Sequence, residues 1–254
     1  MRPRHSALIF CFALLTAACG RKGALIYPDM LVPAAPSYAS GQQSGLAVKL
    51  KFALPDKDIS GKSLQGVTGV KISRMESETG KVVCRSCLAD YLLLRTVYLG
   101  NLPPGIQRFG NRLILLDSEV KPSHSYSYRI AAFTADGADG ASAAIDGVHI
   151  GSPFSGPVLT AESHQTEIRL QYAMPSPASG RVLGYNLYRS TTAGGISFQP
   201  LNRELLKDKE FVDRSLARGV KYRYTARALL EVTTENVVES LGSAEVEVML
   251  KDDE

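Results

Sequence analysis

The sequence predicts an all-β protein that contains two tandem copies of one β-sandwich. Apolar and polar residues alternate over residues 46–52 and again over residues 168–172, which is the pattern of half-buried strands. Helical periodicity is scarce, and three short blocks of the first half recur in the same order in the second half. A duplicated, strand-rich design accounts for all three observations.

The composition is that of a chain with packed cores. Of the 254 residues, 44% are hydrophobic and 21% are charged, which excludes an intrinsically disordered protein. The length is enough for one to two domains. The formal net charge is +4, from 29 Lys and Arg against 25 Asp and Glu, and this excess is too small to indicate a nucleic-acid partner.

The first eighteen residues have the features of an export signal. Arg2 and Arg4 precede an apolar run over residues 6–18. A helix of that length rises only about 20 Å, whereas the hydrocarbon core of a bilayer is roughly 30 Å thick. Residues 1–18 are therefore expected to be a signal peptide and not a membrane span.

The end of the apolar run indicates lipid attachment. Residues 15–20 (LTAACG) resemble a bacterial lipobox, although Thr16 stands where that family usually has leucine. The resemblance implies that Cys19 is acylated, with palmitate among its lipids, and that the chain is anchored in the envelope of a Gram-negative bacterium. Gly20 stands where an aspartate would signal inner-membrane retention, so the outer membrane is expected. The alternatives are an ordinary cleaved signal peptide and an apolar start of the chain with no export role.

The residues after the cysteine carry a second resemblance. Residues 19–28 (CGRKGALIYP) resemble the start of a small lipoprotein family that associates with the lipopolysaccharide-export barrel, with Ala24 in place of the usual proline and Ile26 inserted. This implies an accessory factor of that machine, engaged through the lipidated N-terminus. In a simpler interpretation, Arg21 and Lys22 lie against anionic head groups, at about 1 kcal/mol each.

Residues 19–36 are expected to form the lipidated N-terminus and a tether. Pro28, Pro33 and Pro36 are spaced so that no helix can run through this stretch. Such a segment favours an extended conformation of about 3.1 Å per residue.

The internal repeat begins after the tether. Residues 52–55 (FALP) correspond to residues 172–175 (YAMP), and residues 69–74 correspond to residues 184–189. In the third block, an offset of 96 places Asp117, Tyr126 and Tyr128 on Asp213, Tyr222 and Tyr224. Three blocks in the same order indicate a duplicated domain.

These blocks resemble fibronectin type III domains over nearly all of residues 37–250. In that family the second strand ends in an aromatic residue followed by a proline, as at Phe52 and Tyr172 here. The resemblance implies two immunoglobulin-like β-sandwiches, over residues 37–150 and 151–250.

The third block matches the tyrosine corner of such sandwiches. The ring of Tyr126 or Tyr222 is expected to pack in the core while its hydroxyl bonds to backbone at a turn between strands. We interpret both tyrosines as structural. The chain has no tryptophan. Phe52 and Tyr172 are therefore expected at the central core position, supported by Tyr128, Tyr188 and Tyr224.

The first copy carries an insertion that contains two cysteines. Asp117 follows Gly69 by 48 positions, whereas Asp213 follows Gly184 by 29, so the first copy has 19 extra residues. Residues 91–98 in the insertion are rich in β-formers and predict an added strand or hairpin, which is either a docking surface or a decoration.

Three interpretations fit the Cys84-x-x-Cys87 spacing. A redox pair needs a βαβ context, and a zinc site needs two further ligands, whereas His124, His149 and His164 are scattered singly. A structural disulfide needs only an oxidising compartment, which export provides. We expect the disulfide between Cys84 and Cys87, with a thiol-disulfide factor as the alternative.

The sequence contains none of three motifs that are typical of an enzyme active site. A glycine-rich phosphate loop, a His-Glu-x-x-His helix motif and a Gly-x-Ser-x-Gly elbow are all missing. We expect no catalytic residues, no metal and no cofactor. The sequence predicts a lipid-anchored, non-catalytic binding or scaffolding module. Its expected partners are the bilayer, through acylated Cys19, and another envelope protein or a glycan. The short join at residues 150–153 predicts that the two sandwiches form a stiff rod.

Overall fold

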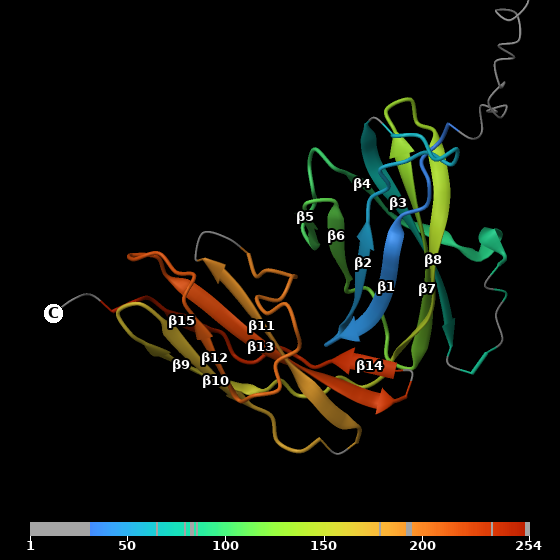
Figure 1. The fold of residues 1–254 in the computed structure, drawn as a ribbon. Coiled ribbons are helices and arrows are strands. Elements are labelled where there is room, and N and C mark those ends of the chain that lie inside the picture. The colour runs from blue at the N-terminus through green and yellow to red at the C-terminus, as the bar shows by residue number, and fades with distance from the viewer. Residues whose placement is uncertain are drawn as a thin grey trace, which may run out of the picture.

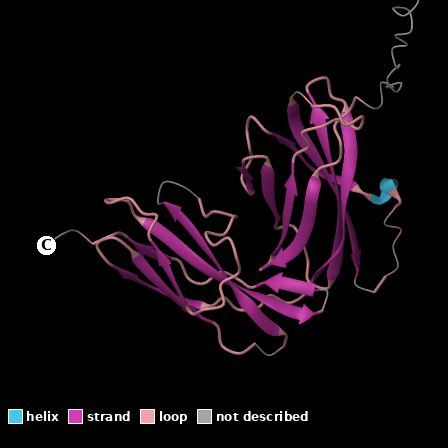
Figure 2. Ribbon diagram, viewed as in Figure 1, coloured by secondary structure: helices cyan, strands magenta, loops and turns pink. Residues whose placement is uncertain are grey.

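The computed structural model describes residues 31–251 except 65, 79, 82, 83, 85, 178, 192–194 and 235. The predicted signal peptide (1–18), Cys19 and most of the tether lie outside the described residues. Figures 1 and 2 show two strand-rich bodies, and the helical turn η2 (Leu88–Asp90) is the one helical element among the described residues. Within the described part of the chain, no helix is long and apolar enough to cross a membrane.

The first body is a sandwich of two four-stranded sheets. One sheet has the order β1-β2-β6-β5 and the other has the order β4-β3-β7-β8, with antiparallel pairing throughout. Apolar side chains from both inner faces form one core, which includes Phe52, Ile72, Leu113 and Tyr126. The strands are β1 (Ser37–Ser44), β2 (Ala47–Ala53), β3 (Val67–Glu78), β4 (Leu92–Tyr98), β5 (Ile106–Phe109), β6 (Arg112–Asp117), β7 (His124–Thr134) and β8 (Asp139–Ile150).

The second body repeats this plan with fewer strands. A three-stranded sheet, β9-β10-β12, faces a sheet in which β13 pairs with β11, β14 and β15. Its core is separate from the first and includes Leu170, Tyr172, Leu187 and Tyr224. The strands are β9 (Val158–Ser163), β10 (Ile168–Ala173), β11 (Arg181–Thr191), β12 (Glu210–Asp213), β13 (Tyr222–Thr233), β14 (Asn236–Glu239) and β15 (Val246–Val248).

The all-β, immunoglobulin-like sandwich fold predicted from the sequence is confirmed. Phe52 and Tyr172 are both 2% exposed at the centre of their cores, where the pattern of an aromatic residue and a proline places them. Leu46, which continues the apolar alternation of residues 46–52, instead lies in the turn before β2 and is 62% exposed. A tight turn at Gly45 (φ 59°) ends the alternation there.

The insertion contributes two strands to the first sandwich that the second lacks. β4 pairs with β3 at one edge of its sheet, and β5 pairs with β6 in the opposite sheet. Between β11 and β12 the second sandwich has a loop instead, which is attached to β11 by an isolated bridge between Tyr185 and Leu206 and by further hydrogen bonds, such as that from the Leu201 amide to the Leu187 carbonyl at 2.7 Å.

The end of the predicted tether is docked and not extended freely. The Ala34 amide donates to the Lys57 carbonyl at 2.9 Å, and the Pro33 carbonyl accepts from the Ala141 amide at 2.9 Å. Pro33 and Pro36 are buried. These prolines stop a helix, as expected, but they also pack on the first sandwich, so any free tether ends before residue 33.

The two sandwiches share one sheet. β14 of the second sandwich pairs in parallel with β1 of the first, with Ser44 opposite Glu239, and this contact fuses two sheets into one of eight strands. Figure 1 shows β14 beside the end of β1, with the two bodies set at an angle to each other. The join is therefore bent, and the sandwiches do not lie in line as a straight rod.

Candidate functional site

Both predicted corner tyrosines hold a turn of their own sandwich. The Tyr126 hydroxyl accepts a hydrogen bond from the Lys121 amide at 2.9 Å, and the Tyr222 hydroxyl accepts one from the Ala217 amide at 2.8 Å. Both tyrosines are buried. In each copy the tyrosine lies five residues after the amide that it binds. The two tyrosines therefore have the same structural role, and neither is accessible to a ligand.

A buried carboxylate stands beside each corner. In the first sandwich, Asp117 accepts from Arg74 at 2.8 Å and from the Tyr128 hydroxyl at 2.9 Å. The Arg74 guanidinium also lies over the Tyr126 ring, 5.2 Å from its centroid. Every charged and polar group in this cluster therefore has a partner.

The second sandwich repeats the cluster residue for residue. Asp213 accepts from Arg189 at 2.7 Å and from the Tyr224 hydroxyl at 2.8 Å, and Arg189 lies 5.4 Å from the centroid of the Tyr222 ring. Burial and the neighbouring Asp carboxylate raise the pKa of Tyr224 well above its usual value, and burial and Asp117 do the same for Tyr128. Both hydroxyls thus stay protonated and remain donors.

The sequence repeat contains the arginine and the aspartate of this cluster at matching positions in both copies. Arg74 and Arg189 end the second repeated block, and Asp117 and Asp213 begin the third. Their shared positions in the two copies were the signal that each arginine pairs with its own aspartate.

A second buried cluster joins the two sandwiches, and we call it the interdomain lock. It consists of Ser44 and Lys49 from the first sandwich and Asn186, Tyr188 and Glu239 from the second. Glu239 is 1% exposed and accepts from the Lys49 ammonium, from the Tyr188 hydroxyl and from the Ser44 hydroxyl, the last at 2.5 Å. Ser44 and Lys49 donate to Oε2, whereas Tyr188 donates to Oε1, which also accepts from Asn186 at 3.2 Å. The Glu239 carboxylate therefore has donors from both sandwiches.

The lock is ionised at neutral pH. Burial alone would raise the pKa of Glu239, but the Lys49 ammonium and the donors from Ser44 and Tyr188 outweigh burial and lower the pKa to about 2. Burial lowers the pKa of Lys49 to about 8, despite the attraction of Glu239. Both groups are thus charged between these two values.

The lock changes the role expected for Tyr188. The sequence predicted that its ring would support the second core, but Tyr188 is not part of that core. It lies instead against the first sandwich, where the Lys49 ammonium is 2.9 Å from its hydroxyl and 4.9 Å from its ring centroid. Alternation puts Tyr188 on the face of β11 away from the core, and the first sandwich covers that face.

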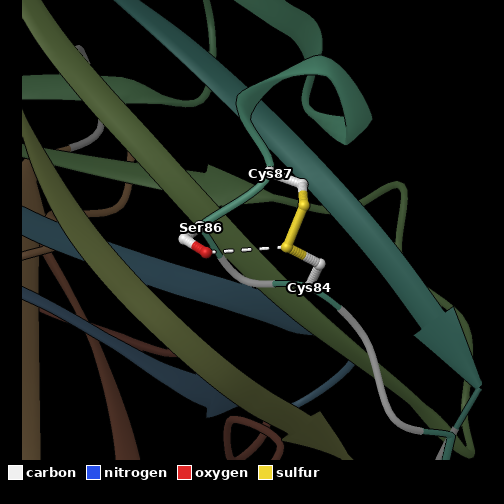
Figure 3. The surroundings of a disulfide bond; sticks show 3 residues. All are labelled: Cys84, Ser86 and Cys87. Atoms are coloured by element: carbon white, nitrogen blue, oxygen red, sulfur yellow. Dashed lines mark hydrogen bonds between the residues drawn. A yellow bond between two sulfur atoms is a disulfide. The ribbon is translucent and has the colours of Figure 1, made fainter.

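Cys84 and Cys87 form a disulfide in the insertion, directly before η2, as Figure 3 shows. Both cysteines are exposed, and the Ser86 hydroxyl lies 3.5 Å from the Cys84 sulfur. The described residues of this turn, Cys84, Ser86 and Cys87, are all exposed and take no part in the core described above. The effect of the bond is therefore local to the insertion.

The same insertion presents apolar side chains to solvent, and we call this area the β4 surface. It consists of Leu88 in η2 and of Leu92, Leu93 and Tyr98 in β4, all more than half exposed. β4 is an edge strand of the described sheet. Figure 2 shows η2 on the side of the first sandwich that is remote from the second. An apolar edge strand of this kind is open to pairing with another chain.

Two of the histidines considered for zinc, His124 and His149, lie on the neighbouring strands β7 and β8, and His164 lies between β9 and β10. His124 lies beside Glu76, His149 is in β8, and His164 lies beside Glu162. Among the described residues, no three His, Cys, Asp or Glu side chains gather as a metal site would require.

No family model and no curated protein matches this chain. Among solved structures, the chain is similar to the crystal structure of chicken CNTN1 FN1-FN3 domains, at 14% sequence identity and a TM-score of 0.32. The match covers 87% of this chain and 66% of that one.

Proposed function

We propose that this protein is a lipid-anchored, non-catalytic binding or scaffolding module of the bacterial cell envelope. The observation that carries the proposal is the β4 surface. It combines an edge strand with several exposed leucines in and just before that strand, whereas monomeric proteins usually keep such edges short, charged or covered. A partner protein that covers Leu88, Leu92 and Leu93 removes this apolar area from water.

The supporting framework is stiff. The shared sheet and the interdomain lock hold the two sandwiches together, so a partner bound at β4 is held at a defined place relative to the second sandwich. For the anchor, the support is the sequence of residues 15–20, which resembles a lipobox, and the outer membrane is the expected location. A rigid framework of this kind lowers the ordering cost of binding a partner.

The docking role is tested by photo-crosslinking in living cells. A photoreactive residue at Leu92 is expected to give one position-specific adduct with another envelope protein. The matched control is Val158, which is also an exposed apolar strand residue. Equal labelling at both positions, or no adduct at Leu92, would contradict docking through β4. The anchor is tested separately: a palmitate analogue is expected to label the wild type and not Cys19→Ala.

A second candidate is an accessory factor of the lipopolysaccharide-export barrel. The observation that favours it is the resemblance of residues 19–28 to a lipoprotein family that associates with that barrel. A crosslinking pull-down is expected to recover the barrel with the wild type but not when Arg21 and Lys22 are replaced by Gln. Recovery that is unaffected by these changes, or absent altogether, would count against engagement through the N-terminus.

The thiol-disulfide alternative has less support from the surroundings of the cysteines. Cys87 precedes a helical turn of only three residues, which offers little dipole to stabilise a thiolate. The double variant Cys84→Ser/Cys87→Ser decides the matter. Loss of a thiol-disulfide activity in a folded protein would support the redox role, and an unchanged phenotype would support a structural bond.

A further inference from the structure

A cleft of about 620 Å³ lies where the first sandwich meets the second. One wall is the outer face of β1, β2 and β6, which Figure 1 shows on the side turned toward the second sandwich. The other wall is formed by residues 199–203. The volume falls in the range of sites that hold small molecules, and domain interfaces are common places for such sites.

The walls carry three cations that lack acidic partners. Lys51 lies opposite Ile114 in the ladder and Arg112 lies opposite Ala53, so the two residues are diagonal neighbours on one sheet face, with backbone positions roughly 7–8 Å apart. Arg203 comes from the second sandwich. None of the three side chains makes a hydrogen bond or ion pair with another described residue, and no described lining residue is acidic. Like charges this close repel each other, and a bound anion would relieve the repulsion.

An aromatic side chain is presented at the same cleft. Tyr38 is 82% exposed and has a φ of 52°, in a region that non-glycine residues seldom occupy. The β1–β2 ladder shifts register between Ser37 and Ser40, and such a bulge redirects a side chain. Backbone strain of this kind is also stored at binding sites, where it holds a side chain toward a ligand.

We propose that this cleft binds an acidic saccharide, a sugar that carries carboxylate or phosphate groups. The Arg112 and Arg203 guanidinium groups match both anions with paired hydrogen bonds, and Lys51 adds a point charge. The Tyr38 ring offers an apolar face to a sugar ring. The Ser40 hydroxyl and the Gln199 amide, which also line the cleft, are donors and acceptors for sugar hydroxyls.

The strands favour a saccharide over an acidic peptide. β2, the middle strand of the wall, is hydrogen-bonded to β1 on one side and to β6 on the other. It therefore has no free edge to which an extended peptide could add as a strand. The site is also distinct from the β4 surface, so the binding of a saccharide here goes beyond the proposed docking of a protein.

The interdomain lock preorganises the site. Lys49 and Lys51 are two residues apart in β2 and so point to the same face. Lys49 ties that face to Tyr188 and Glu239, and Gln107 of β5 adds two hydrogen bonds to the backbone of Ile196 and Phe198, at 2.8 and 2.7 Å. The two walls are thus held before any ligand arrives, which lowers the cost of binding.

Titration calorimetry on the full chain in detergent tests the proposal. Two acidic saccharides, trigalacturonate and glucose 6-phosphate, distinguish carboxylate from phosphate sources, and binding of at least one is expected to weaken as salt rises. Maltotriose, inorganic phosphate and a hexaglutamate peptide are the comparison probes, and each is expected to bind more weakly. Equal binding of maltotriose would refute the role of charge. Equal binding of phosphate or hexaglutamate would indicate a plain anion or peptide site, and failure of both acidic saccharides would overturn the proposal.

Matched variants connect that binding to the cleft. Lys51→Gln/Arg112→Gln is expected to lower affinity about tenfold or more, and Arg203→Gln is expected to do so from the opposite wall. The control Lys57→Gln/Lys62→Gln removes the same charge from an exposed loop outside the cleft and is expected to bind like the wild type. Equal losses in the cleft and control variants would mean that only net charge matters, which would overturn the site.

Tyr38 separates a binding role from a structural one. Glycine tolerates positive φ, so Tyr38→Gly is expected to leave the melting temperature unchanged or to raise it. The affinity for the acidic saccharide is expected to fall at the same time, since the ring is lost. Unchanged affinity would show that the ring takes no part in binding.

Discussion

The two sandwiches have the same interior and different edges. Each holds an arginine, an aspartate and two tyrosines in the same geometry, from Arg74 and Asp117 in the first to Arg189 and Asp213 in the second. The first alone has the disulfide, η2, β4 and β5, whereas the second alone has a strand, β14, that reaches the other sandwich. Packing thus constrained the duplicated interior, while the edges diverged.

The difference also indicates where function lies. In the repeated clusters the aspartates and tyrosines are buried and each side chain already has a hydrogen-bond partner within the cluster or in the turn beside it, so they offer little to a ligand. The three features that occur once, namely the β4 surface, the interdomain lock and the cationic cleft, are those that face solvent or the other sandwich. Some of the variants below change a feature that only one sandwich has, and others change the same feature in both sandwiches.

The largest effect is expected where the two sandwiches meet. Lys49→Met leaves the buried Glu239 carboxylate without its cation, and we expect a loss of about 3–5 kcal/mol in the free energy of unfolding. Lys51→Met, two residues away but open to the cleft, is the matched control and is expected to change stability by less than about 0.5 kcal/mol. Since the chain has no tryptophan, denaturant unfolding is best followed by circular dichroism. Equal losses for the two variants would show that the lock contributes nothing specific.

Acid is expected to weaken the same contact. The pKa of Glu239 is about 2 in the folded protein and 4.5 in the unfolded chain, so its stabilisation is present above pH 4.5 and is lost as the pH falls toward 2. The difference is worth about 3 kcal/mol. Glu239→Gln is expected to remove this part of the acid dependence, whereas Glu204→Gln, an exposed control, is expected to keep it. A wild-type and a Glu239→Gln curve of the same shape would contradict the assignment.

Asp117→Asn and Asp213→Asn test whether the two interiors are equivalent. Each replaces a buried carboxylate that accepts from an arginine and a tyrosine, and each is expected to lower stability by about 2–3 kcal/mol. Hydrogen exchange of each sandwich measures the two losses separately. A difference larger than about 1 kcal/mol would show that the matching geometry does not give matching energetics.

The disulfide is expected to matter to the first sandwich alone. Cys84→Ser/Cys87→Ser removes a short loop closure that is worth about 2 kcal/mol on the chain-entropy model. Protection of the insertion against proteolysis is expected to fall, with the second sandwich unchanged. A loss of stability in both sandwiches would mean that the bond acts beyond the insertion.

The smallest effects are expected at the corner tyrosines. Tyr126→Phe and Tyr222→Phe keep each ring but remove the hydroxyl that accepts from a turn amide, which is expected to cost about 1 kcal/mol in each sandwich. Thermal melts of the two variants are expected to shift to a similar degree. A loss of stability in only one of the two variants would show that the two tyrosine corners are not energetically equivalent.

Much of the interior could be predicted from residue patterns. The alternation around Phe52 and Tyr172 placed both rings in the cores, and the repeat aligned Tyr126 with Tyr222. The candidate site was less accessible. Lys49 and Lys51 have the same pattern in the sequence, as polar residues on the outer face of one strand, yet one is 3% exposed and ion-paired while the other lines a cleft. Only the position of the second sandwich distinguishes them.

The sequence by itself determined the sandwich fold, its duplication, the strand-rich insertion and the central aromatic residues of each core, Phe52 and Tyr172. These depend on periodicity and on contacts within one copy, which are local in the chain or repeated in it. The tertiary structure decided that β1 and β14 share a sheet, that Glu239 meets Lys49 and that Lys51, Arg112 and Arg203 face one cleft. These contacts join parts of the chain that are far apart in the sequence. They form when the surfaces of the two folded sandwiches pack against each other, and no local sequence pattern encodes that packing.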